Sequence, residues 1–329
     1  MKDITINKDN IVKDKEYCKK YQIERIKYVS NALARRIIKR NIFEQKYINN
    51  VLSGSDGNNE IYNKIISGTP FMAGRFGGNE IRTIADVLYE KSGGKCGGLS
   101  DRTRFKITNQ AGFFPNDKEM LYRFEELYVE SCKQVDLIGV WDMFLQGEIT
   151  KRYLADATYS ELRTMEPYYY EHPWSKGLEN KKVLVIHPFS DTIESQYKKR
   201  ESIFENKDIL PEFELMTLKA VQTIAGQKDE RYSTWFEALE DMYSKAMEKD
   251  FDIALIGCGA YGFPLAAKIK SAGKQAIHMG GALQILFGIK GNRWDNHEFI
   301  GKLYNDSWVR PSDNEKVKKS EVVEGSCYW

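Results

Sequence analysis

Residues 251–291 read FDIALIGCGAYGFPLAAKIKSAGKQAIHMGGALQILFGIKG, and this stretch decides the fold. The apolar run 252–256 predicts a strand buried in a parallel sheet. The run 264–270 is typical of a helix, and 274–278 predicts the next strand. Strand, glycine turn, helix and strand in this order form one unit of a parallel α/β sheet.

Glycines stand at both strand-to-helix turns. Gly257, Gly259 and Gly262 form G-x-G-x-x-G after the first strand, and Gly280 and Gly281 follow the second. A strand that leads through glycines into a helix start favours a phosphate site, because free N–H groups and the helix dipole point at the ligand.

Three interpretations of these glycines stay open. A dinucleotide site requires an acidic residue at the end of the second strand, and that end reads His278-Met279-Gly280. The unit also lies late in the chain, whereas nicotinamide enzymes more often have it first. The alternatives are glycines that serve only tight packing of helix on strand, and a site for another phosphate-bearing ligand.

The rest of the chain repeats the same α/β pattern. We expect a Rossmann-like, doubly wound, mostly parallel sheet with an N-terminal helical extension. The division that we expect is a helical extension (1–55), a first α/β half (56–175), a second Rossmann-like half (176–298) and a tail (299–329). Residues 53–59, SGSDGNN, predict a loop, and 93–108 predict a long mobile loop or lid.

The composition excludes several classes. A net charge of +2 gives no case for nucleic-acid binding. Five scattered cysteines indicate a reducing compartment and argue against a zinc site. Neither a signal peptide nor a membrane-spanning run is expected, so we expect a cytoplasmic protein. The cluster Arg35, Arg36, Lys39 and Arg40 favours either peripheral contact with an anionic membrane or a solvated helix face.

Polar side chains follow the predicted strands, and the carboxyl ends of parallel strands share one edge of a sheet. Arg75 is suited to bind a phosphate or carboxylate. Glu80 is a cation ligand, a general base or an ordinary glutamate in the first turn of a helix. His187 is either catalytic or structural. The remaining residues that we expect at this edge are Asp142, Asp191, Glu194, Tyr261, His278 and Gln284.

Residues 73–80, AGRFGGNE, are similar to the R-F/Y-G-D-G-E segment of the GT-D-type glycosyltransferases. The later unit, from Ala254 to Gly281, resembles the C-terminal α/β unit of that family, so the resemblance covers roughly residues 60–290. It implies a Rossmann-like fold, a nucleotide-sugar donor and a glycan or glycoconjugate acceptor. The family's acidic pair implies Mn²⁺ or Mg²⁺, with Glu80 as ligand.

This sequence departs from the family pattern because Gly78 stands where the aspartate is expected. One carboxylate binds a cation far more weakly than two, which puts metal use in doubt. The missing charge comes from Asp86, from Asp142 or from no residue at all. The catalytic candidates are Glu80, His187 and Asp142. The nucleotide-sugar candidates are Arg75, Gly77, Gly78, Asn79, Gly257, Gly259, Tyr261, Gly262, His278, Gly280 and Gln284.

Three functions follow as hypotheses. The first is a glycosyltransferase of surface polysaccharide biosynthesis. The second is a non-catalytic component of a synthesis complex that binds a nucleotide or glycan, which the missing aspartate favours. The third is an NAD(P)-dependent oxidoreductase.

Overall fold

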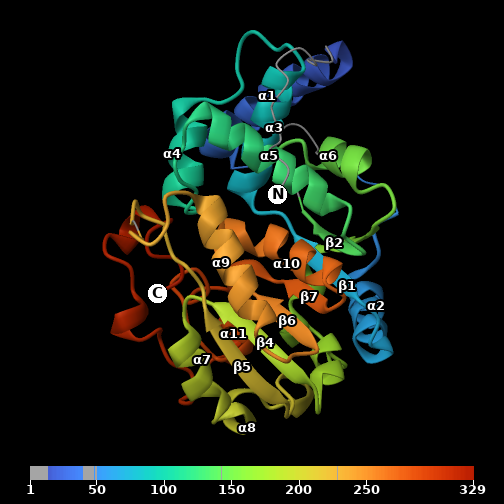
Figure 1. The fold of residues 1–329 in the computed structure, drawn as a ribbon, viewed down its shortest axis with the longest axis vertical. Helices are drawn as coiled ribbons and strands as arrows, with labels where there is room; N and C mark the ends of the chain where they lie inside the picture. Colours follow the sequence, from blue (N-terminus) through green and yellow to red (C-terminus); the bar gives the residue numbers. More distant parts are fainter. Residues whose placement is uncertain (1–13, 40–47, 49, 142, 228) are drawn as a thin grey trace.

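A computed structural model describes residues 14–39, 48, 50–141, 143–227 and 229–329 (Figure 1). Its centre is one sheet of seven strands, all parallel, in the order β3-β2-β1-β7-β6-β4-β5. The strands are β1 Phe71–Arg75, β2 Leu137–Val140, β3 Thr158–Glu161, β4 Lys182–His187, β5 Glu214–Lys219, β6 Ile253–Ile256 and β7 Gln275–His278. The predicted α/β, doubly wound fold class is confirmed.

Alternating side chains of the strands supply two apolar cores, one on each face of the sheet. In β4, Leu184 and Ile186 enter one core, whereas Val183 and Val185 enter the other. This alternation is the period of two of a strand, and burial on both faces explains why the strands are nearly continuous apolar runs.

Helices cover both faces (Figure 1). The first core is packed by α1 Lys15–Ile38, α3 Gly78–Lys91, α4 Asp101–Asn109, α5 Lys118–Cys132, α6 Gln146–Tyr153, α9 Trp235–Met247 and α10 Gly262–Ser271. The second is packed by α2 Gly54–Ser67, α7 Ser190–Tyr197, α8 Arg200–Ile203, α11 Leu283–Leu286, α12 Ile300–Leu303 and the C-terminal segment. Within the described residues, no helix has both the length and the apolar character needed to cross a bilayer.

Two segments predicted as loops are helical. Residues 53–59 begin α2, because the Ser53 hydroxyl accepts the Asp56 N–H at 3.2 Å and caps the helix. A Cβ on Gly57 would lie 2.0 Å from Ser160 Oγ, so this glycine serves close packing. The predicted lid contains α4, which Ser100 caps through the Thr103 N–H.

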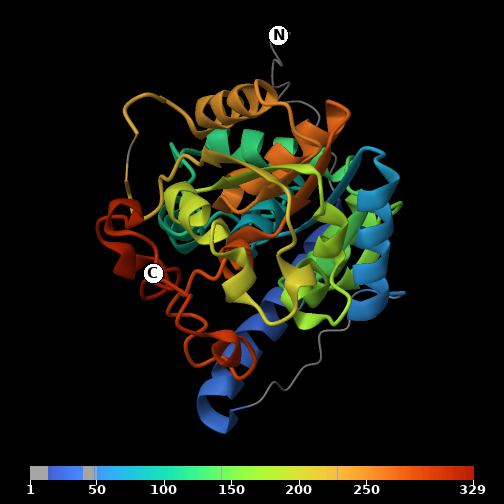
Figure 2. The ribbon, with the colours of Figure 1, turned by 90° about the horizontal axis from the view of Figure 1, so that it is seen from below.

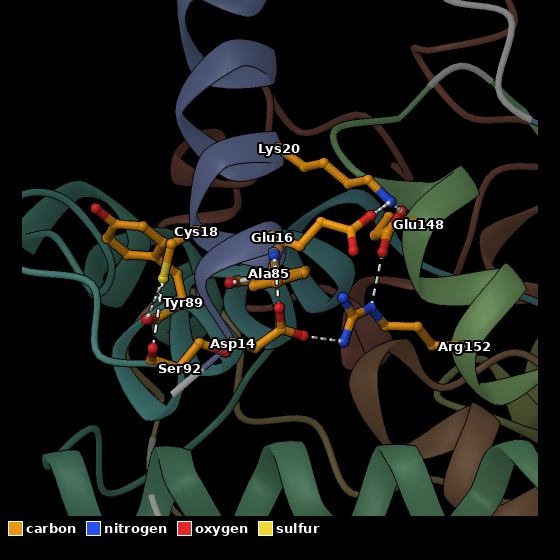
Figure 3. Close-up of polar contacts among 10 residues, drawn as sticks. Asp14, Glu16, Cys18, Lys20, Ala85, Tyr89, Ser92, Glu148 and Arg152 are labelled. Atoms are coloured by element: carbon orange, nitrogen blue, oxygen red, sulfur yellow. Dashed lines mark hydrogen bonds and ion pairs between the residues drawn. The ribbon is translucent and has the colours of Figure 1, made fainter. Parts of the chain in front are cut away.

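The N-terminal helix α1 is fixed at its beginning and projects from the body towards its end (Figures 1 and 2). Figure 3 shows the fixed end, where Arg152 joins Asp14 and Glu148, each at 2.8 Å. Lys20 also pairs with Glu148, at 3.0 Å. These ion pairs hold α1 against α6 and confirm a helical N-terminal extension. Helix α1 ends at Ile38, and residues 40–47 lie outside the described residues.

The C-terminal segment lies on the opposite side of the molecule from α2 (Figure 2). Its Glu315 Oε1 accepts the N–H groups of Asp191 and Thr192, at 2.9 and 3.3 Å, and so caps α7. Neither Ser190 nor Asp191, the first two residues of α7, caps this helix with its side chain. A carboxylate 123 or more positions away takes the role that local sequence was expected to fill.

Candidate functional site

A pocket of about 80 Å³ lies at the carboxyl ends of β4 and β6. From there β4 leads to β5 on one side, while β6 leads to β7 on the other, which makes this a topological switch point. Ligands of doubly wound sheets bind at such points. We call it the strand-end pocket. Its lining is Gln110, Ala111, His187, Pro188, Phe189, Val221, Gln222, Thr223, Ile224, Gly257, Cys258, Gly259, Tyr261, Gly281, Gln284 and Tyr328.

The first glycine turn forms one wall of this pocket. The Gly257 N–H donates to Ile186 O at 2.9 Å, so it belongs to the sheet and is not available to a phosphate. Gly259 has φ +58°, a left-handed conformation that favours glycine. Within the described part of the chain, the N–H groups of Cys258 and Gly259 make no hydrogen bond, and they remain as donors for a ligand.

His187 contributes a fixed donor to the same pocket. Its Nδ1 accepts the Phe189 N–H at 3.0 Å, so the proton of the neutral ring lies on Nε2. Complete burial lowers the pKa of His187 to about 3, which keeps the ring neutral near pH 7. A neutral ring with a fixed tautomer suits hydrogen bonding to a ligand better than it suits proton transfer near neutral pH.

Tyr261 and Gln284 form further walls. The Tyr261 ring stacks on Trp235 with centroids 4.8 Å apart, and its hydroxyl lies 3.1 Å from that of Thr223. Gln284 Nε2 donates to Tyr328 O at 3.1 Å, and its buried Oε1 has no partner among the described residues. That free acceptor belongs to a residue of the pocket lining and can serve a ligand.

His278 lies beneath the surface, outside the lining of the strand-end pocket. A Cβ on Gly262 would lie 2.2 Å from the His278 ring, so the third glycine of the motif allows helix α10 to pack on this histidine. Burial and the charge of Arg75 lower the pKa of His278 to about 3. Its buried Nδ1 has no partner within the described residues.

Arg75 and Glu80 form a charged centre at the same edge. Arg75 ends β1, and its Cδ and Nε lie 3.8 Å from the place of a Cβ on Gly280. Its guanidinium lies 5.2 Å from the centroid of the Trp141 ring. Burial raises the pKa of Glu80, while its own backbone N–H, Arg75 and the N–H of Asn79 act in the opposite direction. The carboxylate of Glu80 therefore folds back over the beginning of α3.

Gly77 makes that position of Glu80 possible. A Cβ at residue 77 would lie 2.0 Å from Glu80 Oε2, a distance that no packing allows. Within residues 73–80, Gly77 and Glu80 are thus linked, because the glycine leaves the space that the carboxylate fills.

The charged centre and the glycine turn share one edge of the sheet. The Tyr128 hydroxyl donates to Ala260 O at 2.5 Å. Burial raises the pKa of Tyr128, and the nearby charge of Glu80 raises it further. Asn79 Nδ2 donates to Gln110 Oε1 at 3.2 Å, and Gln110 lines the strand-end pocket. Glu80 itself does not line this pocket.

Glu166 is a second carboxylate near Arg75 that the sequence did not indicate. Burial raises the pKa of Glu166, while the Tyr168 hydroxyl, a donor at 2.9 Å, and the charge of Arg75 act against this. Glu166 follows β3, a four-residue strand that the sequence left undetected. An acid shortly after a strand would have been the available signal.

A second pocket, of about 310 Å³, lies on the far side of Asn79. We call it the basic pocket. It is lined by Arg25, Tyr28, Val29, Asn31, Arg35, Gly78, Asn79, Arg82, Ser100, Arg102, Thr103, Lys106, Trp141, Met143 and Phe144. Gly78 and Asn79, which the sequence assigned to the nucleotide sugar, belong to this pocket and not to the strand-end pocket.

Neither candidate for the missing aspartate joins Glu80 in the described structure. Asp86 is completely buried and accepts from Tyr21 and Thr103, each at 2.7 Å, and pairs with Arg82 at 2.9 Å. It therefore ties α1, α3 and α4 together. Asp142 lies outside the described residues. Of the other strand-end candidates, Asp191 pairs with Lys219 and Glu194 binds Thr217, away from both pockets.

Comparison with known proteins adds a fold neighbour. No family model matches the chain, and no curated protein matches it. Among solved structures, the chain is similar to one described as a selenomethionine-substituted structure of domain of unknown function 1792 (DUF1792). The TM-score is 0.42 and the identity 12%, over 80% of this chain and 92% of the other.

Proposed function

We propose that the protein is a glycosyltransferase that moves a sugar from a nucleotide-sugar donor to a glycan or glycoconjugate acceptor in surface polysaccharide biosynthesis. One observation carries the proposal: Arg75 and Glu80 lie at the same sheet edge as the strand-end pocket, beside the glycine turn. This transfer needs a pocket for a nucleotide, a positively charged side chain for its phosphates and a buried carboxylate.

The donor nucleotide occupies the strand-end pocket in this proposal. The His187 Nε2–H and the free Gln284 Oε1 provide one donor and one acceptor for the base or ribose. The N–H groups of Cys258 and Gly259 face the phosphates, and Arg75 neutralises the charge that develops on the departing diphosphate. The neutral ring of His278 fills the space between β1 and α10.

Glu80 is the proposed general base toward the acceptor hydroxyl. Burial raises the pKa of this carboxyl, which brings its proton affinity closer to the value that a base needs near neutral pH. The bond from the sugar to the diphosphate breaks, the acceptor oxygen forms the new bond, and its proton passes to Glu80.

In this proposal Arg75, rather than a divalent cation, offsets the charge of the departing diphosphate. Among the described residues, no three His, Cys, Asp or Glu side chains gather as metal ligands, and the guanidinium of Arg75 lies near Glu80. A hard cation prefers several oxygen ligands, which Glu80 alone does not supply. Assays with and without Mn²⁺ or Mg²⁺ test this directly.

Replacing Glu80 by Gln tests the assignment, because the amide keeps the shape of the side chain and removes its basicity. We expect release of nucleoside diphosphate to fall about a hundredfold or more, with donor affinity nearly unchanged. Unchanged turnover in Glu80→Gln would refute the role of Glu80.

The non-catalytic alternative is favoured by Gly78 in place of the family's aspartate and by the contacts of Glu80 with its own helix. Under that alternative the wild-type protein binds nucleotide sugars and releases no nucleoside diphosphate with any cation. The oxidoreductase hypothesis requires tight binding of reduced NAD(P), which a fluorescence titration measures.

Peripheral contact with an anionic membrane is the proposed placement of α1. Within α1, seven Lys or Arg residues outnumber two Glu. The face away from the body exposes large apolar side chains, with Ile26, Leu33 and Ile37 each more than half exposed. Basic residues beside an exposed apolar face suit an anionic lipid surface. Arg40, the last member of the predicted basic cluster, lies outside the described residues.

A further inference from the structure

The basic pocket concentrates positive charge. Among the described residues, its lining includes Arg25, Arg35, Arg82, Arg102 and Lys106 and no Asp or Glu. The residues come from three helices, α1, α3 and α4, that fold together around the buried Asp86. Sequence alone does not reveal this cluster, because about 80 positions separate its first and last members.

Most of these charges lack a carboxylate partner. Arg82 pairs with Asp86 at 2.9 Å and lies over the Phe144 ring at 4.0 Å, so its charge is partly balanced and its position fixed. In the part of the chain that the structure describes, Arg25, Arg35, Arg102 and Lys106 form no ion pair. Four uncompensated cations around one cavity repel one another, and an anion bound among them removes that repulsion.

Helix beginnings add to the positive potential. Gly78 and Asn79 of the first turn of α3 and Ser100, the N-cap of α4, line the same cavity. The dipole of each helix is positive at this end, so both helices favour an anion in the cavity.

Aromatic side chains give the pocket a second character. Tyr28, Trp141 and Phe144 line it, and flat aromatic faces suit the apolar faces of sugar rings. A cavity of about 310 Å³ has room for more than a phosphate group alone. Trp141 also faces Arg75 at 5.2 Å, so the pocket adjoins the Arg75–Glu80 centre.

We propose that the basic pocket binds the acceptor, and that this acceptor is a sugar bearing a phosphate or diphosphate group. This inference rests on the proposed transferase function. The phosphate lies among Arg25, Arg35, Arg102 and Lys106, and the sugar stacks near Trp141 with its hydroxyl toward Glu80. Donor and acceptor then approach the charged centre from opposite sides of the Asn79–Gln110 hydrogen bond.

Calorimetric titration of the full chain tests the pocket without depending on turnover. The probes are inorganic pyrophosphate, a water-soluble sugar 1-phosphate and the corresponding neutral sugar. We expect the two phosphates to bind and the neutral sugar to bind at least about tenfold more weakly. The double variant Arg25→Gln/Arg102→Gln should bind the phosphates about tenfold to a hundredfold more weakly and keep its affinity for a nucleoside diphosphate.

The matched control is Lys198→Gln/Lys199→Gln, which removes the same charge from two exposed residues away from both pockets. Equal losses in the control and pocket variants would overturn the proposal, because they would indicate general charge attraction. Lys106→Gln, a single change in the same lining, keeps the test decisive if the double variant fails to fold.

A lipid-linked sugar diphosphate in detergent micelles distinguishes the source of the phosphate. Tighter binding than the soluble sugar phosphate indicates a lipid-borne acceptor, and equal binding indicates a soluble one; both support the pocket. Absence of binding by every phosphate overturns it. If phosphate binds through these arginines while Glu80→Gln retains full turnover, the anion site stands and the catalytic proposal falls.

Discussion

A substitution at Gly77 displaces Glu80 without changing the chemistry of its carboxyl group. A Cβ on Gly77 would lie 2.0 Å from Glu80 Oε2 and 2.4 Å from its Cδ, so the carboxylate of a Gly77→Ala variant must leave its position. The backbone of Gly77 has φ −80° and ψ 150°, an extended conformation that alanine adopts freely. The substitution therefore moves a side chain and leaves the chain path unchanged.

Gly78→Ala is the matched control. The nearest atom to a Cβ on Gly78 is Met143 Sδ at 4.0 Å, an ordinary contact. Gly78 is the first residue of α3, where alanine is favoured over glycine by up to about 1 kcal/mol. One methyl group is added in each variant, at adjacent positions, and only one of the two displaces Glu80.

The expected magnitudes separate stability from turnover. Displacing Glu80 removes its contacts with the N–H groups of residues 79 and 80, which costs about 1–2 kcal/mol. Reduced freedom of the unfolded chain returns about 0.4–1 kcal/mol. The net loss of stability is therefore about 1 kcal/mol. Loss of a positioned base lowers kcat by a factor of about 10² to 10⁴.

The assay is release of nucleoside diphosphate in the presence of an acceptor, with urea unfolding and calorimetric donor binding measured on the same preparations. We expect Gly77→Ala to fold, to bind donor like the wild type and to lose kcat. Gly78→Ala should keep kcat at saturating acceptor and change at most the acceptor KM, because Gly78 lines the basic pocket. Wild-type kcat in Gly77→Ala, or an equal loss in both variants, would refute the assignment of the base to this position of Glu80.

Three further predictions follow from burial and exposure. Burial lowers the pKa of His278 from 6.5 to about 3, so the neutral ring stabilises the fold above about pH 6.5, and this stability is lost as the pH falls towards 3. In urea titrations, the stability advantage of wild type over His278→Gln should therefore shrink by about 2 kcal/mol between about pH 7 and pH 5. A difference that does not depend on pH would contradict this prediction. Asp86→Ala should cost about 3–5 kcal/mol in the free energy of unfolding, because it leaves Arg82 without its carboxylate partner, and a loss below about 1 kcal/mol would show that Asp86 does not tie α1 to the body. Ile26→Gln/Leu33→Gln should weaken co-sedimentation with phosphatidylglycerol vesicles about tenfold or more, whereas Ile66→Gln, an equally exposed site on α2, should not; equal binding by all three proteins would exclude α1 as the contact.

Local patterns were enough to predict most of the sheet. The strands β6 and β7 are short apolar runs bounded by turn residues, and each begins and ends within one residue of the predicted runs 252–256 and 274–278. Burial on both faces leaves little ambiguity in such runs. The helices α5 and α9 are also predictable from local sequence, because their N-cap residues, Asp117 and Thr234, directly precede them.

Elements that depend on distant contacts were not predictable. The glycines of α2 indicate a loop until Gly57 is seen against Ser160, a residue about a hundred positions away. In β3 the residues Thr158–Glu161 have no continuous apolar run, because the strand lies at the edge of the sheet. Losing β3 from the prediction also lost Glu166, whose position near Arg75 follows from that strand.

The candidate site shows the same division. Arg75, Glu80 and the glycine turn follow strands directly, so their common edge was predictable. Their grouping into separate pockets was not, because Gly78 and Asn79 face α1 and α4 rather than β6. The position of α1 depends on Asp86, Tyr21 and Arg152, and no sequence pattern links these residues.

The pairing of β1 with β7 has a consequence for biosynthesis. Met72 pairs with Ala276, so about 200 further residues must be synthesised after β1 before its partner strand in the centre of the sheet exists. Until then the nascent chain presents β1 with an open edge, and β6 with another, both apolar and both able to pair with a foreign strand. Any C-terminal truncation that ends before Gln275 removes the strand that joins the two halves. Such fragments should aggregate rather than form a smaller working protein.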